Sequence, residues 1–158
     1  MDKSVILKIN YEISEIDILV DKSDVLISLC KNKEPDFIEI TAIGGILQSF
    51  YNGIENIFVL IAKSLNFDFK TSPQWHRALI DFMFAQPNFL QQKLRLRLTE
   101  YMGFRHFYRH TYGYTVKWEK CSHLFLEMKD FWNIIKKAFN DYLESNKTGD
   151  PKAPPCSF

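Results

Sequence analysis

Apolar residues recur every three or four positions along most of this chain, which is the spacing of one face of an α-helix. The first such set begins near the N-terminus and comprises Ile6, Ile9, Ile13, Ile16 and Val20. The pattern continues to Cys30 and stops before Pro35, because proline cannot continue a helix. It predicts a first long helix that ends close to Cys30.

A second predicted helix has eight apolar positions at the same spacing. They are Ile40, Ile43, Leu47, Phe50, Ile54, Ile57, Ile61 and Leu65. Gly44, Gly45 and Gly53 lie inside this run, and each costs about 1 kcal/mol in a helix relative to alanine. The glycines indicate either the close approach of another helix or a bend in this one.

Weaker patterns indicate the remaining elements. Thr71, Ser72 and Pro73 predict a helix start, with a hydroxyl cap before proline at the first helical position, and this short helix ends near Pro87. Two further long helices are predicted from apolar positions at helical spacing, namely Leu90, Leu94, Leu98 and Tyr101 for the third and Val116, Leu124, Met128, Phe131, Ile135, Phe139 and Tyr142 for the fourth. No alternating apolar and polar pattern is long enough to build a sheet.

Together these elements predict an all-α protein, an antiparallel four-helix up-and-down bundle with one short extra helix, over residues 1–145. At 158 residues the chain is long enough for one domain with its own core and short for two. Residues 146–158 are polar and contain three prolines, so we expect them to form a flexible C-terminal tail.

Composition argues against a membrane or secreted protein. No uncharged apolar run reaches the roughly 18 residues that a membrane span needs, and the N-terminus carries acids where a signal peptide is apolar. Cys30, Cys121 and Cys156 are odd in number and far apart, which favours neither a disulfide framework nor a zinc site. We expect a cytoplasmic protein with reduced thiols and no membrane partner.

The net charge of +1 conceals an uneven distribution along the chain. Residues 1–60 carry five lysines and ten acids, a net charge of −5, whereas residues 91–120 carry seven basic residues and two acids, a net charge of +5. A local positive field favours a polyanionic partner or substrate. The alternative is that these charges belong to a solvated helix face with no partner.

The basic region contains the segment FRHFYRHTYGY, residues 104–114, which holds two of the four histidines. His106 and His110 are four apart and share a face on a continuous helix, as metal-binding histidines do. Zinc needs a further ligand, and the only acid nearby, Glu100, lies about 200° round the helix from His106. We therefore expect neither a metal nor a cofactor.

Arg105 and His110 are five residues apart, about 140° on an unbroken helix, but Gly113 suggests that the helix ends here. At a helix end the two side chains could converge on one phosphate. The arginine supplies a planar cationic fork for phosphate oxygens, and the histidine gives or takes a proton at neutral pH. Such a pair suffices for metal-free cleavage of RNA by its own 2′-hydroxyl. The alternative is that both residues only cap the helix.

The other histidines and the tryptophans are expected to be structural. Trp75, Trp118 and Trp132 are predicted to be core or interface anchors. His76 and His123 each lie alone beside a helical apolar pattern, and neither is given a functional role.

The motif Arg105-x4-His110-x-Tyr112 resembles the R-x4-H-x-Y signature of HepT-like toxins in the HEPN superfamily of ribonucleases. The resemblance extends to the runs 49–66, 75–79 and 100–114, and it covers about residues 1–145. The family usually has a polar residue, often Asn or Asp, after the motif arginine. His106 occupies that position here, which keeps the polarity and adds a titratable group.

The resemblance implies a homodimeric, metal-independent endoribonuclease of a toxin–antitoxin pair, with Arg105 and His110 as catalytic residues. We further expect His106 or Arg109 to position the phosphate. It also implies an RNA substrate and a minimal nucleotidyltransferase antitoxin that transfers AMP to the motif tyrosine, here Tyr112. Two alternatives remain at this point. One is a non-catalytic protein that only docks the nucleotidyltransferase, and the other is a helical scaffold with an incidental basic patch.

Overall fold

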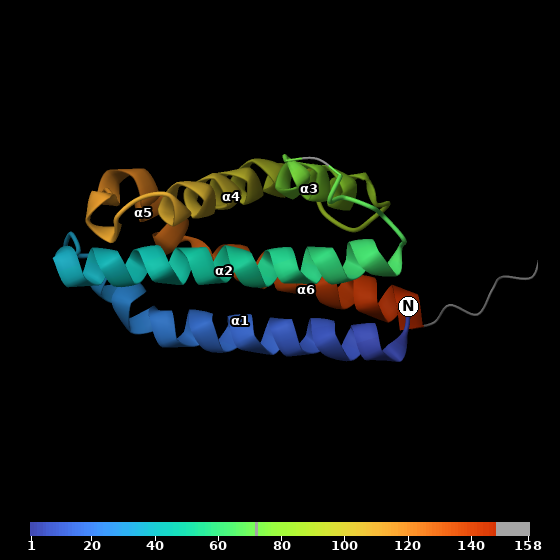
Figure 1. Ribbon diagram of the computed structural model, residues 1–158. Helices are drawn as coiled ribbons and strands as arrows, with labels where there is room; N and C mark the ends of the chain where they lie inside the picture. The colour runs from blue at the N-terminus through green and yellow to red at the C-terminus, as the bar shows by residue number, and fades with distance from the viewer. Residues whose placement is uncertain (72, 148–158) are drawn as a thin grey trace, which may run out of the picture.

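The computed structural model describes residues 1–71 and 73–147, and within these ranges it contains helices and no strand (Figure 1). The α-helices are α1 (Lys3–Cys30), α2 (Phe37–Ser64), α3 (Trp75–Ala85), α4 (Arg95–Arg109), α5 (Trp118–Leu126) and α6 (Met128–Lys147). Short 3-10 turns, Gln92–Leu94 and Gly113–Thr115, precede α4 and α5. The all-α prediction is confirmed.

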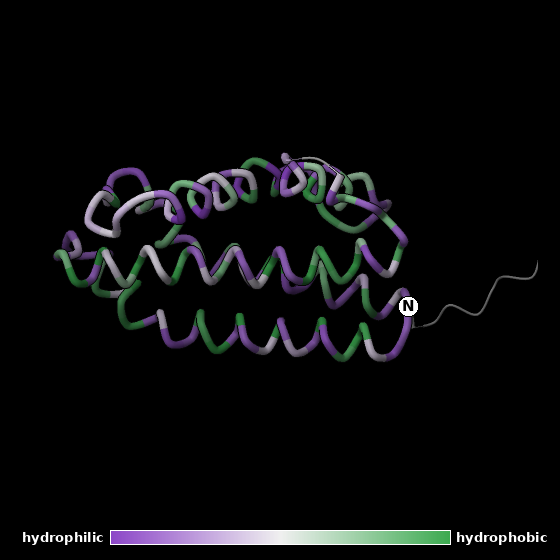
Figure 2. Tube along the Cα trace, viewed as in Figure 1, coloured by the Kyte–Doolittle hydropathy of each residue, from purple (hydrophilic) through white to green (hydrophobic). Residues whose placement is uncertain are grey.

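Helix α2 lies in the middle of the bundle, between α1 on one side and the layer of α3 and α4 on the other (Figure 1). It also packs against α5 and the Gly113–Thr115 turn. Helices α1 and α2 run antiparallel, α4 runs antiparallel to α2, and α6 lies behind α2 along α1 (Figure 1). Because α2 is covered on several sides, most of its circumference has to be apolar. Figure 2 shows apolar positions returning turn by turn along each helix.

Aromatic rings join α2 to the helices around it. The ring of Phe50 lies 5.1 Å from that of Tyr101 in α4 and 6.1 Å from that of Trp132 in α6, centroid to centroid. The Tyr101 hydroxyl donates a 2.6 Å hydrogen bond to the Leu124 carbonyl oxygen, which ties α4 to α5. As predicted, the tryptophans belong to the core. Trp132 is buried, and Trp75 and Trp118 are half-buried against it.

The glycines of α2 allow other side chains to approach closely, and α2 continues unbroken through them. A Cβ atom at Gly53 would lie 2.6 Å from Ile16 Cγ1 of α1, and one at Gly44 would overlap the Tyr108 ring of α4. No comparable contact exists at Gly45, where the nearest such atom is 4.0 Å away. Of the two explanations, close approach therefore holds for Gly44 and Gly53.

Acidic residues of α1 pair with α6. The Asp17 carboxylate accepts a 2.7 Å hydrogen bond from Trp132 Nε1 and lies 2.5 Å from Lys136 Nζ, and Asp24 lies 2.9 Å from Lys129 Nζ. Part of the acidic excess of the N-terminal region therefore serves to join these two helices.

Three predicted helix boundaries are wrong. The fourth predicted helix is two helices, α5 and α6, separated at Glu127. The apolar spacing continues across this residue, and the Glu127 N–H still bonds to the His123 carbonyl at 3.2 Å. The direction changes because α5 packs against α4 whereas α6 follows α1 (Figure 1), which no local pattern encodes. In addition, α4 starts at Arg95 rather than Leu90, after a 3-10 turn.

The third wrong boundary is the start of α3, which lies at Trp75 with Gln74 as its N-cap. Pro73 is therefore not the first helical residue, and Ser72 of the predicted cap lies outside the described residues. Helix α6 reaches Lys147, so the predicted tail lies almost entirely outside the described residues, as does Cys156.

The two cysteines of the described residues, Cys30 and Cys121, are buried free thiols. Burial raises the pKa of both, that of Cys121 to about 11. Among the helices of residues 1–71 and 73–147, none is long and apolar enough to cross a membrane.

Candidate active site

The motif segment closes the end of the bundle where α2 begins (Figure 1). Helix α4 ends at Arg109, and His110 is its C-cap, with its backbone N–H bonded to the Phe107 carbonyl at 3.0 Å. The chain then forms the Gly113–Thr115 turn, and a Cβ at Gly113 would lie 3.5 Å from Thr41 in α2. The helix thus ends within the motif, as the sequence predicted.

Arg105 points from α4 towards α2. Its Nε donates a hydrogen bond to the Oδ1 atom of Asn52, and its Nη2 lies 3.5 Å from Oε1 of Glu55. The Arg105 side chain is 15% exposed. The guanidinium is therefore held from one edge, and Nη1 has no hydrogen bond to any group in the described part of the chain.

Glu55 connects Arg105 to a histidine in a third helix. Its side chain is only 6% exposed, and its second oxygen, Oε2, lies 2.5 Å from Nδ1 of His76. His76 is the second residue of α3, and its ring stacks on that of Trp75 at a centroid distance of 3.6 Å. One buried carboxylate thus lies between an arginine of α4 and a histidine of α3.

Tyr51 lies next to this cluster. It is fully buried, and burial, followed by the nearby Glu55 carboxylate, raises the pKa of its phenol well above the ordinary value. Although Glu55 is close, no group in the described part of the chain meets the Tyr51 hydroxyl in hydrogen-bond geometry. Its phenol therefore stays neutral beside the ion pair.

The histidines of the motif lie together on the exposed side of α4. The ring centroids of His106 and His110 are 4.8 Å apart, and both side chains are exposed, as is that of Arg109. No group of three or more His, Cys, Asp or Glu side chains close enough to hold a metal occurs in the described ranges. Likewise, within these ranges no hydrogen bond joins Arg105 to His110.

Tyr112 extends into solvent just after the helix end. It is 73% exposed, and its ring stacks on that of Tyr114 at a centroid distance of 5.6 Å. The Thr115 hydroxyl donates a 2.7 Å hydrogen bond to the Tyr112 carbonyl oxygen, which fixes the backbone of the turn. The phenol is therefore presented on a constrained turn and is accessible to another macromolecule.

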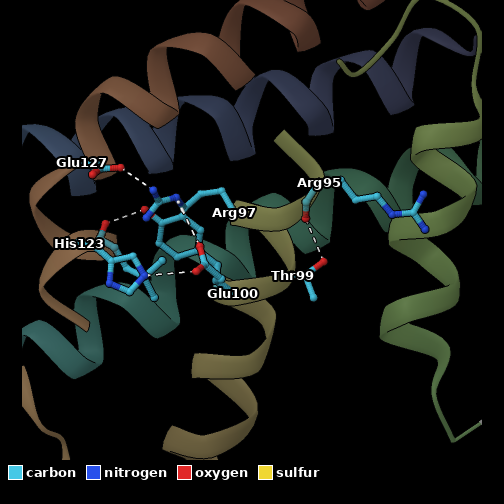
Figure 3. A network of polar contacts seen from close by, with 8 residues as sticks. Arg95, Arg97, Thr99, Glu100, His123 and Glu127 are labelled. Carbon is cyan, nitrogen blue, oxygen red and sulfur yellow. Dashed lines mark hydrogen bonds and ion pairs between the residues drawn. The ribbon is translucent and has the colours of Figure 1, made fainter. Parts of the chain in front are cut away.

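A charged network on another side of α4 holds α5 in place (Figure 3). Arg97 Nη2 lies 2.7 Å from Glu127 Oε2, and Glu100 lies 3.5 Å from both Arg97 and His123. Near this network, a pocket of about 450 Å³ separates α4 from α5; its walls include Gly103, Phe104, Phe107, Val116 and Leu124. The network fixes the two helices that the motif segment connects. It also gives His123 a structural partner.

The sequence did not reveal the contacts of Asn52, Glu55 and His76 with the motif arginine. One signal was present: Glu55 lies four residues after Tyr51 and three before Phe58, a helical spacing that places it beside apolar residues of α2. A carboxylate at a buried helical position needs a cationic or hydrogen-bonding partner. What the sequence could not give was the identity of that partner, because Arg105 is fifty residues further along the chain.

Comparison with known families gives one match. The family model described as HepT-like protein matches residues 42–146, which is more than half of the chain and includes Asn52, Glu55, His76 and the motif. The chain therefore belongs to the HepT-like proteins of the HEPN-type toxin family. No curated protein matches the chain. No solved structure matches it either.

The two fully buried tyrosines provide a test of the site's packing. We expect Tyr101→Phe to lower the free energy of unfolding by about 1 kcal/mol, because it removes the hydrogen bond to Leu124. Tyr51→Phe, the matched change, should leave it unchanged or raise it, because that hydroxyl lacks a partner in the described part of the chain. Urea unfolding followed by circular dichroism measures both.

The same pair predicts the response to alkali. Burial raises the pKa of both phenols in the folded chain, whereas in the unfolded chain they ionise near pH 10. Stability from the two neutral phenols is thus fully present below about pH 10 and is lost as the pH rises further. The double Phe variant should lose less stability between pH 9 and about 11 than the wild type. An equal loss in both proteins would contradict this account.

Proposed function

We propose that this protein is the toxin of a toxin–antitoxin pair and cleaves RNA as a metal-independent endoribonuclease in the cytoplasm. The main support is one juxtaposition in a HepT-like chain: Arg105, on the last turns of α4, is held by Asn52 and the buried Glu55, and His110 ends that helix with an exposed ring. The +5 charge of residues 91–120 supports a polyanionic substrate.

In the proposed reaction the ribose 2′-oxygen attacks the adjacent phosphorus, and His110 accepts the 2′-hydroxyl proton. The bond from phosphorus to the 5′-oxygen breaks, and a protonated histidine returns a proton to that oxygen. The products are a 2′,3′-cyclic phosphate and a free 5′-hydroxyl, with no change in oxidation state. Arg105 stabilises the charge on the pentacoordinate phosphate, a contribution of a few kcal/mol for a preorganised donor.

The geometry of Arg105 is compatible with this role. Charge-assisted hydrogen bonds are about 2.7–2.9 Å long, so the 3.5 Å contact with Glu55 leaves the guanidinium incompletely paired. Its Nη1 edge, which has no hydrogen bond in the described part of the chain, has the planar donor geometry that suits phosphate oxygens. His106 and Arg109, both exposed nearby, are proposed to bind flanking phosphates.

One histidine does not readily act as acid and base in the same turnover, so we propose a two-fold homodimer that brings two copies of the motif together. His110 of each subunit then performs one proton transfer. Sedimentation of the protein as a monomer at micromolar concentrations, with full RNase activity, would contradict this arrangement.

For RNA cleavage we expect activity in excess EDTA and no cleavage of DNA, which lacks the 2′-hydroxyl. His110→Ala should reduce kcat by at least about 100-fold because it removes the proton-transfer group. Arg105→Ala should reduce it by a similar factor, because the phosphate charge then has no fixed donor. Gel analysis of a labelled RNA, with kcat and KM measured separately, provides the test.

Matched controls are available in the same chain. His123→Ala and Arg95→Ala change a histidine and an arginine that pair with Glu100 and Asp81, outside the motif, and should retain activity. Full activity in both motif variants would return Arg105 and His110 to a structural role. Cleavage that EDTA abolishes and zinc restores would instead favour a metal site at His106 and His110.

We also propose that a minimal nucleotidyltransferase antitoxin transfers AMP from ATP to the Tyr112 hydroxyl, with release of pyrophosphate and of the phenol proton. The high exposure of this phenol supports the proposal, and the added phosphodiester would neutralise the nearby arginines and block entry of RNA. Mass spectrometry of the toxin after incubation with such an enzyme and ATP should show one or more AMP units on the Tyr112 peptide, with RNase activity lost. Tyr112→Phe should remain unmodified and active.

An unmodified Tyr112 peptide in an inhibited complex would show that the partner acts by binding alone. A wild-type protein that binds the nucleotidyltransferase but cleaves no RNA on its own would instead favour the alternative of a non-catalytic docking protein. The exposed rings of Phe107, Tyr112 and Tyr114 are the observation that supports this alternative.

A further inference from the structure

We infer that Glu55 and Asn52 are positioning residues for Arg105, and that His76 orients Glu55 for this purpose. The inference concerns how the guanidinium is held, and only its kinetic consequence rests on the proposed RNase activity. Its basis is the arrangement of these four side chains from α2, α3 and α4, which are joined by two hydrogen bonds and one ion-pair contact.

Burial of the Glu55 carboxylate is unfavourable, and packing alone does not explain why a charged residue occupies this position. Burying a carboxylate is unfavourable unless it is paired and hydrogen-bonded, and Glu55 lies within the apolar face that carries Ile54, Ile57 and Phe58. An apolar residue at this position would satisfy the core. A charged residue here instead serves to hold a cation at a defined place.

Two acceptors fix the orientation of the guanidinium as well as its location. Asn52 and Glu55 are three residues apart on α2, so their side chains lie on the same helical face. Asn52 accepts from Nε, and Glu55 lies beside Nη2. Because these nitrogens belong to one edge of the planar group, the two contacts together set the rotation of its plane. They leave Nη1 directed away from α2.

His76 completes the arrangement by occupying the other oxygen of Glu55. The contact between His76 Nδ1 and Oε2 leaves Oε1 facing Arg105. Stacking on Trp75 limits rotation of the histidine ring. The carboxylate is thus held from α3 while it holds the arginine of α4, so the orientation of Arg105 depends on residues from three helices.

The direct test is the Nε–Hε signal of Arg105 in a ¹⁵N–¹H NMR spectrum, assigned by its loss in Arg105→Lys. In the wild type the hydrogen bond to Asn52 should shift this signal and protect it from solvent exchange. We expect Glu55→Gln and Asn52→Ala each to move the signal towards the position of an exposed arginine. Glu15→Gln, which removes an exposed carboxylate from α1, should leave it unchanged.

Kinetics provide the second measurement. Glu55→Gln should lower kcat about tenfold or more and change KM less than about threefold, because a misoriented donor still binds phosphate but supports the transition state poorly. Glu55→Asp keeps the charge and should recover part of the loss. A purely structural role would instead lower thermal stability in both variants with unchanged kcat at low temperature.

The outcomes separate this inference from the proposed function. An Arg105 signal that is unchanged in both Glu55→Gln and Asn52→Ala would overturn the inference even if the protein cleaves RNA. Conversely, a wild type that does not cleave RNA, but in which both variants move the signal, would reject the proposed RNase and retain the positioning of Arg105. If Glu55→Gln does not fold, Asn52→Ala alone decides, since Asn52 is only partly buried.

Discussion

The charge of Glu55 has to be balanced inside the bundle, and the arrangement around the motif follows from how this is done. Helix α2 is covered by α1, α3, α4 and α5, so the Glu55 carboxylate in its middle is only 6% exposed. Removing one partner of a buried ion pair commonly costs about 3–5 kcal/mol, because the other charge is left uncompensated. Arg105 from α4 supplies the opposite charge, and Nδ1 of His76 from α3 contacts the second oxygen of the carboxylate. The last turns of α4 are thereby fixed against α2, and the rest of the motif, from His106 to Tyr112, continues from this fixed helix end.

Close packing of α2 against its neighbours makes these contacts possible. Gly53 lets Ile16 of α1 approach α2, and Gly44 receives the ring of Tyr108 from the motif itself. The ring cluster around Phe50 joins α2 to α4 and α6. Beyond Arg109 the helix stops, and the chain presents His110 and Tyr112 to solvent. A rigid interior thus supports an exposed helix end, which is the arrangement a catalytic site on a bundle requires.

Local sequence patterns predicted the helices well where each helix has its own apolar stripe, as in α1 and α2. They also located the end of α4, because Gly113 and the motif interrupt the periodicity. They did not predict the break at Glu127, since the apolar spacing continues from Leu124 to Met128 and the change of direction comes from packing against α4 and α1. For the candidate site, the motif predicts Arg105, His110 and Tyr112, and their roles stay predictions. The buried Glu55, which contacts Arg105, and the half-buried His76, which contacts Glu55, are known only once the helices are placed together, because a single sequence shows an unusual charge without showing what neutralises it.

In the proposed function, Arg105 and His110 act on a phosphate that is attacked by the neighbouring 2′-hydroxyl. The most direct measurement uses a DNA oligonucleotide that contains a single ribonucleotide, with the products analysed by mass spectrometry. The account predicts one cut, on the 3′ side of that ribonucleotide, which leaves a 2′,3′-cyclic phosphate or the 3′-phosphate formed from it by water. Cleavage at other positions, or a product with a 5′-phosphate, would contradict the account.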